Sequence, residues 1–112
     1  KEKKYSFLLE EGFAFYVDES TFFKVDFYDK ARTILANDRY RISNIIKENT
    51  NDNYEIKAVV CGAFVKYLVT VYGVDKFAIL WKNIENNSIF NSTFNKSLPD
   101  LEIEFYKFLE KK

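Results

Sequence analysis

The 112-residue sequence contains no histidine and a single cysteine, Cys61. The lack of histidine limits the chemistry most, because histidine is the commonest general base and metal ligand in proteins. It excludes a Ser-His-Asp triad or a Cys-His pair built within this chain. A single cysteine excludes an internal disulfide and a cysteine-rich zinc site, so cysteine usage does not indicate a cellular compartment.

Proline and glycine are also scarce, with one and three residues, whereas 19% of the residues are aromatic. So few helix breakers, together with long periodic apolar stretches, predict an all-α, single-domain bundle of about five helices over residues 1–112. The 17 basic and 17 acidic residues cancel. A neutral chain without a basic stripe argues against a nucleic-acid surface, and no apolar run is long enough for a transmembrane segment.

Apolar residues recur at helical spacing through most of the chain. We expect helices over residues 5–18, 27–36, 53–72, 74–84 and 98–112, with a short helix after Ser88. Asp26, Asp52 and Ser97 are candidate N-caps for three of these helices. Asn37 is expected to end the second helix in a left-handed conformation.

The segments between these helices have weaker patterns. Residues 39–42 are expected to be extended, and a single helical turn is expected around Ile45 and Ile46. Residues 48–51 have the composition of a loop. The apolar segment 21–25 is too short to assign and fits a packed loop or a strand.

The segment over residues 7–18 is apolar on nearly every side, as in a buried helix, yet it carries two adjacent carboxylates. Glu11 has apolar residues one turn before it and one turn after it, and a buried, unpaired carboxylate is unfavourable. Glu11 therefore requires a proton, a cationic partner or a metal ion. Glu10 has the same alternatives and is expected to point outward if Glu11 points inward. Gly12, a poor helix former, indicates that another group approaches this backbone closely.

Other candidate residues have simpler structural explanations. Asp18 and Glu19 are expected to form a solvated helix end. Cys61 is expected to be a buried, inert thiol, because no histidine is present to activate it. Tyr54 stands at the start of the long helix 53–72, where its hydroxyl could face a cleft, although packing is the default role. Three arginines could hold an anion, but an exposed surface is the preferred interpretation for Arg32, Arg39 and Arg41.

Three segments, in this order, resemble gluzincin metallopeptidases of the peptidase-MA-like type. Residues 8–16 (LLEEGFAFY) are similar to the family pattern W-L-x-E-G-x-A-x-Y. Residues 62–73 (GAFVKYLVTVYG) are similar to a later helix that often reads S-F-V-x-Y-L-x-x-x-Y-G. Residues 94–105 (FNKSLPDLEIEF) are similar to F-G-x-S-L-x-x-L-E-x-x-W, with Phe105 in place of the final Trp. The three segments keep the family's order and are spread over residues 8–105 of the chain.

The resemblance implies an all-helical C-terminal subdomain of a zinc metallopeptidase. In that family the Glu before the Gly is the third zinc ligand, and this position corresponds to Glu11. The other two ligands are histidines of an upstream His-Glu-x-x-His helix, whose Glu is the general base. A zinc ion would offset the unfavourable burial of Glu11 and would keep one position for water.

The chain departs from the family pattern in two respects. It lacks the His-Glu-x-x-His helix, so this chain alone is expected to be inactive: it is a fragment of a longer protein, or the family's chemistry has been lost. The start at Lys1 without a Met favours the fragment. The related aminopeptidases also carry a Tyr that stabilises the oxyanion. That position here is Ala58, and Tyr54, one turn earlier, is the candidate catalytic replacement.

Two functional hypotheses follow. In the first, the chain is the C-terminal helical portion of a zinc-dependent metallopeptidase and supplies Glu11 and part of the substrate cleft. Its partners would be the upstream His-Glu-x-x-His segment and a peptide substrate, and its cofactor would be Zn²⁺. In the second, the chain is a non-catalytic interaction or scaffold domain, with Glu11 in a structural ion pair. The sequence immediately upstream would discriminate between the two.

Overall fold

The computed structural model of the protein describes residues 5–19, 26–48, 52–86 and 88–111. These residues form seven α-helices and two other helical turns and contain no strand, which confirms the all-α class. The elements are η1 (Phe7–Glu11), α1 (Gly12–Asp18), α2 (Phe27–Ile34), η3 (Asp38–Tyr40), α3 (Ile42–Glu48), α4 (Tyr54–Tyr72), α5 (Val74–Lys82), α6 (Ile89–Phe94) and α7 (Leu98–Glu110). The predicted segment 21–25 and most of the predicted loop 48–51 lie outside the described residues.

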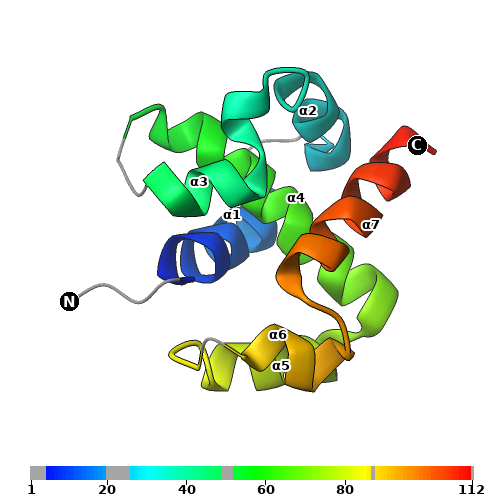
Figure 1. Cartoon of the computed structure of the whole chain (residues 1–112). Helices are drawn as coiled ribbons and strands as arrows, with labels where there is room; N and C mark the ends of the chain where they lie inside the picture. The colour runs from blue at the N-terminus through cyan, green and yellow to red at the C-terminus, as the bar shows by residue number, and fades with distance from the viewer. Residues whose placement is uncertain (1–4, 20–25, 49–51, 87, 112) are drawn as a thin grey trace.

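Helix α4 is the centre of the molecule. Every residue from 57 to 65 is buried, including Cys61 and Gly62. Figure 1 shows α4 crossing the molecule, with α2 and α3 at one end and α5 and α6 at the other. The helices η1, α1 and α2 pack directly against it. A helix that is apolar or small on all sides is covered on all sides.

Two predicted helix starts are confirmed. The backbone N–H of Tyr28 donates to Oδ1 of Asp26 at 2.8 Å, so Asp26 is the N-cap of α2. The backbone N–H of Asp100 donates to Oγ of Ser97 at 3.2 Å, so Ser97 is the N-cap of α7. Each side-chain oxygen satisfies one of the backbone donors that a helix leaves unpaired in its first turn.

The predicted cap of the central helix is wrong. The N-cap of α4 is Asn53, which has a left-handed backbone (φ 53°) and forms no side-chain capping bond. The Asp52 carboxylate instead accepts a hydrogen bond from Arg39 at 3.0 Å. A charged partner from a neighbouring element therefore competes with the local backbone for this carboxylate.

The predictions for residues 37–48 are confirmed only in part. The helical turn expected around Ile45 and Ile46 lies within a longer helix, and η3 covers part of the stretch expected to be extended. Asn37 does not end α2 in a left-handed conformation: its side chain accepts the N–H of Arg39 at 3.0 Å and begins η3. Helix α3 follows, and the hydroxyl of Tyr106 on α7 accepts its Ile42 N–H at 3.0 Å. This tertiary cap has no local sequence signal, so α3 begins earlier than the predicted turn. The described residues form seven α-helices, slightly more than the predicted five or so.

Candidate functional site

The N-terminal helix and α4 touch at Gly12. A Cβ atom placed on Gly12 would lie 2.7 Å from the carbonyl oxygen of Cys61 and 2.9 Å from Cγ2 of Val65. Side-chain Cβ atoms do not approach a backbone oxygen so closely, so this separation requires glycine. The predicted close approach at Gly12 is therefore confirmed, and the approaching backbone is that of α4.

The two adjacent carboxylates lie just before this contact and differ in exposure. Glu11 is the last residue of η1, a π-helical turn that continues directly into α1. Turns of this kind are rare in proteins, and those that occur are often found at functional sites. Glu10 is exposed and Glu11 is half-buried, which agrees with the expectation that Glu10 points outward when Glu11 points inward.

The two predicted site residues, Glu11 and Tyr54, are in direct contact. Tyr54 is the first residue of α4, and its hydroxyl donates a hydrogen bond to Oε1 of Glu11. The Tyr54 ring packs edge-on against Phe7 and Phe15, with centroid distances of 5.7 Å and 6.1 Å. Because Phe7, Glu11 and Phe15 follow one another at four-residue intervals, the ring lies along one side of the N-terminal helix. These aromatic contacts direct the hydroxyl onto the carboxylate.

The carboxylate changes the acidity of its neighbours. The hydrogen bond to Glu11, with a smaller effect of burial, raises the pKa of Tyr54 to about 12. A phenolate at this position would place two negative charges side by side. Burial, followed by the charge of Glu11, also raises the pKa of the Cys61 thiol. Cys61 is fully buried and stays protonated, in agreement with the prediction of an inert thiol.

Glu11 has no cationic partner within the described part of the chain. No Lys or Arg there lies within ion-pair distance of it, so its partner is a phenol and not the expected ammonium or guanidinium group. Its second oxygen, Oε2, accepts no hydrogen bond from these residues. The structural ion pair of the second hypothesis is therefore not formed over residues 5–19, 26–48, 52–86 and 88–111.

The described residues do not form a zinc site by themselves. They contain no group of three or more His, Cys, Asp and Glu side chains that could hold a metal ion, and the sequence has no histidine. Zinc sites in proteins use at least three protein ligands. Glu11 fits the role of one oxygen ligand, since it is partly exposed and Oε2 has no partner among these residues. Further ligands would have to be supplied from outside this part of the chain.

The position that corresponds to the family's tyrosine offers no functional group. Ala58 is fully buried in α4. Tyr54 is 38% exposed and is the nearest phenol on that side of the helix start. Its hydroxyl is bonded to Glu11, so in this geometry Tyr54 orients the carboxylate.

The prediction of a solvated helix end is wrong for Glu19. Its Oε2 accepts the backbone N–H of Phe27 at 2.7 Å and the ammonium of Lys66 at 2.9 Å. Its side chain is only 13% exposed. Glu19 therefore joins the end of α1 to the start of α2 and to the middle of α4, which is a structural role.

The three arginines do not converge on an anion site. Each pairs with a carboxylate of its own, which supports the preferred interpretation of a charged surface. The pairs are Arg32 with Asp29, Arg39 with Asp52 at 3.0 Å, and Arg41 with Asp38 at 3.2 Å.

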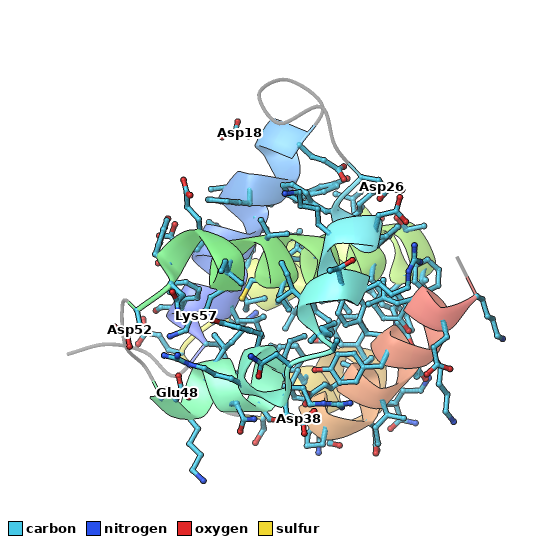
Figure 2. All side chains as sticks on the ribbon, turned by 90° about the horizontal axis from the view of Figure 1, so that it is seen from above. Asp18, Asp26, Asp38, Glu48, Asp52 and Lys57 are labelled. Carbon is cyan, nitrogen blue, oxygen red and sulfur yellow. The ribbon has the colours of Figure 1, made fainter. Side chains whose placement is uncertain are left out.

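The sequence analysis missed a buried lysine. Lys57 is 1% exposed, and its Nζ lies 3.6 Å from Oε1 of Glu48. Figure 2 shows Lys57 and Glu48 at the same end of the molecule, where α3 ends and α4 begins. A signal was present, because Lys57 lies one turn before the apolar residues Val60 and Cys61. A cation on the buried side of a helix requires such a partner.

Two further carboxylates on α7 were also missed. Glu104 accepts hydrogen bonds from the hydroxyls of Tyr67 (2.9 Å) and Tyr72 and pairs with Lys96. Burial opposes the ionisation of Glu104, but the hydrogen bonds from Lys96, Tyr72 and Tyr67 outweigh it and lower its pKa. Glu102 is 7% exposed and faces α3. Its position between Leu101 and Phe105 on the apolar face was the available signal.

The fold and the site define a compact all-α globule with a carboxylate–phenol pair where two helices meet. No protein-family model, no curated protein sequence and no solved structure matches the chain significantly. The gluzincin resemblance therefore depends on the three sequence segments alone. Within the described residues, none of the helices has the length and apolar character needed to cross a membrane.

Proposed function

We propose that the chain is the C-terminal helical subdomain of a gluzincin-like zinc metallopeptidase, in which Glu11 is the third zinc ligand. The environment of Glu11 is the observation that supports this proposal. Its carboxylate is partly exposed, lies next to the Gly12–α4 contact, and is held by the Tyr54 hydroxyl, and no Lys or Arg of the described residues lies within ion-pair distance of it. A fixed carboxylate with one unpartnered oxygen is suited to bind a metal ion.

Tyr54 has a positioning role in this proposal. Carboxylates that bind metals are themselves commonly hydrogen-bonded, and such partners fix the orientation of the ligand. The Tyr54 hydroxyl bonds to Oε1 of Glu11, which directs Oε2 away from the phenol. A role for Tyr54 at the oxyanion of the substrate would require the hydroxyl to leave Glu11 when substrate binds.

The 112-residue chain by itself should be inactive under this proposal. With one ligand and no general base, the 112-residue protein should neither cleave peptides nor bind Zn²⁺ tightly. Tight zinc binding or peptide hydrolysis by the purified chain would show that the assignment of the other ligands to a preceding segment is wrong.

The decisive experiment begins with the coding sequence upstream of Lys1. If it encodes a His-Glu-x-x-His helix, the longer protein is purified and its zinc content is measured by atomic absorption. We expect about one zinc per chain and a loss of affinity of at least tenfold in Glu11→Gln. Glu10→Gln is the matched control, because Glu10 is the exposed neighbour. An absent motif, or equal zinc affinity in Glu11→Gln and Glu10→Gln, would overturn the proposal.

One observation favours the alternative, a helical interaction domain. Helix α5 exposes large apolar side chains: Val74 is 64% exposed, Ile79 47% and Trp81 41%. Exposed apolar patches commonly mark contact sites for other proteins. An upstream sequence without His-Glu-x-x-His, together with self-association of the chain in light scattering that Trp81→Lys abolishes, would favour this function over the peptidase.

A further inference from the structure

A cleft opens between α3 and the start of α7. It has a volume of about 430 Å³. The side chains of Tyr5, Ile46, Leu98 and Pro99 supply its apolar walls. Glu102 is the acidic residue among the described lining residues. The cleft has the volume of a small-molecule site, whose usual form is apolar walls with a few placed polar groups.

The Glu102 carboxylate is held rigidly in this cleft. Its Oε2 accepts the backbone N–H of Ser43 at 3.2 Å, the Ser43 hydroxyl at 3.4 Å and the hydroxyl of Tyr106. Glu102 is 7% exposed, so these bonds replace most of its hydration. The cleft therefore contains a carboxylate whose position is fixed by the protein.

This carboxylate has no cationic partner in the described part of the chain. No Lys or Arg there lies within ion-pair distance of Glu102. Lys47 lines the cleft without pairing, and the Arg41 guanidinium lies over the Tyr106 ring, 4.7 Å from its centroid.

The second oxygen of Glu102, a lining residue of the cleft, has no partner among the described residues. This oxygen, Oε1, accepts no hydrogen bond from them. Among those residues, only Thr93 has a fully buried side-chain oxygen without a partner, so Oε1 keeps contact with solvent. One oxygen of the carboxylate is thus fixed by the protein, and the other is accessible to a ligand.

We propose that this cleft binds a small aliphatic primary amine in its protonated form. The ammonium group would bind Oε1 of Glu102, and the alkyl chain would lie between Leu98, Pro99 and Ile46. Beside Lys47, which forms no ion pair with Glu102 in the described residues, the largely apolar lining has one carboxylate, which complements one cation on a short apolar chain. A divalent metal ion needs several oxygen ligands. The inference does not depend on the proposed peptidase function, because it uses neither Glu11 nor Tyr54.

The test is a titration of the ¹⁵N-labelled chain with n-butylammonium chloride, followed by two-dimensional NMR. The amide of Ser43, which donates to Glu102, is the reporter. We expect saturable shifts at Ser43 and Glu102 with a dissociation constant of about 1 mM. The neutral probe 1-butanol should bind at least about tenfold more weakly. Glu102→Gln should abolish the saturable shifts. Glu110→Gln, which neutralises an exposed residue of the same helix, should leave them unchanged.

A second variant keeps the test informative if Glu102→Gln does not fold. Ser43→Lys retains Glu102 and places a tethered ammonium beside it, so it should block n-butylammonium binding. Three results would overturn the proposal: no saturable shift in the wild-type chain, equal affinity for 1-butanol, or unchanged binding in Ser43→Lys. Each of them leaves the zinc proposal for Glu11 unaffected.

Discussion

The hydroxyl of Tyr54 donates a hydrogen bond to Oε1 of Glu11 and so connects the first residue of α4 with the last residue of η1. Both residues are partly exposed, so the bond adds only about 1 kcal/mol to the stability of the fold. Its main consequences are the orientation of the Glu11 carboxylate and the reduced acidity of the Tyr54 phenol.

Glu11→Gln should lower the pKa of Tyr54 from about 12 toward the ordinary value of 10. The amide is neutral, so it no longer disfavours the phenolate, although it still accepts the hydrogen bond. The measurement is a titration of the tyrosine ring carbons by ¹³C NMR. Glu55→Gln is the control, because Glu55 makes the smallest contribution to this shift. A Tyr54 pKa that stays near 12 in Glu11→Gln would show that Glu11 is not its partner in solution.

The stability of the protein should fall as the pH rises above about 10. Burial or hydrogen bonding raises the pKa of several tyrosines in the folded state, so the folded protein retains protons that the unfolded chain releases. This contribution is complete below the unfolded pKa of 10.0 and is lost as the pH rises through the higher folded values. The tyrosines concerned are Tyr28, Tyr54, Tyr67, Tyr72 and Tyr106.

Urea unfolding at neutral pH and at successive alkaline pH values measures this loss. Tyr106→Phe removes a phenol whose pKa is raised by burial and by its hydrogen bond to Glu102, and it should make the alkaline decline shallower. It should also lower the stability at neutral pH by about 1–3 kcal/mol, because the Ile42 N–H and Glu102 lose a partner. A stability that is constant up to strongly alkaline pH would contradict the prediction.

Gly12→Ala should lower the free energy of unfolding by about 1–3 kcal/mol. The new Cβ would lie 2.7 Å from the Cys61 carbonyl oxygen, and a backbone atom cannot move away as a side chain can. In an uncrowded helix the same change would stabilise by about 1 kcal/mol, so the sign of the effect identifies the contact. Urea unfolding gives the value.

The control for this variant is Ala14→Gly, at an exposed position of the same helix. It should lower the stability by about 1 kcal/mol through helix propensity alone. If Gly12→Ala were more stable than the wild type by a similar amount, the close packing of α1 on α4 would not exist in solution.

The all-α class could be predicted because helical periodicity and local caps, which are visible in short stretches of sequence, indicate it. Asp26 and Ser97 bond to the first turns of their own helices, so their role is visible in a short stretch of sequence. Helix α3 was predicted only as a single turn, because the bond at its start comes from Tyr106, 64 residues away along the chain. A bond of this kind depends on how α7 packs, which no local pattern contains.

In the candidate site, too, some features are visible in the local sequence and others depend on how the helices pack. Gly12 indicated a close approach, but only the fold shows that the Cys61 carbonyl is the neighbour. Glu11 was singled out by its apolar surroundings, whereas its phenolic partner is a consequence of the packing of Tyr54 between Phe7 and Phe15. The negative charge of Glu11 did not predict its partner, because a carboxylate can accept a hydrogen bond from a hydroxyl as well as from a cation.

Glu104→Gln should lower the stability at neutral pH by about 1 kcal/mol, a value reduced by the partial exposure of the pair. The Glu104 carboxylate joins Tyr67 and Tyr72, at the end of α4, to Lys96 and α7. Burial opposes its ionisation, but its hydrogen bonds prevail and hold its pKa below the ordinary 4.5. Its contribution is therefore present above about pH 4.5 and is lost as the pH falls toward the lower folded value.

The difference in melting temperature between wild type and Glu104→Gln should thus be largest near neutral pH and should shrink in acid. Differential scanning calorimetry through the acid range measures it. Glu110→Gln, an exposed neutralisation on α7, should show no such pH-dependent difference. A difference that stays constant well below the ordinary carboxyl pKa of 4.5 would mean that Glu104 acts through its shape and not through its charge. The two phenols would then hold the amide as well as the carboxylate, and the Lys96 pair would contribute nothing measurable.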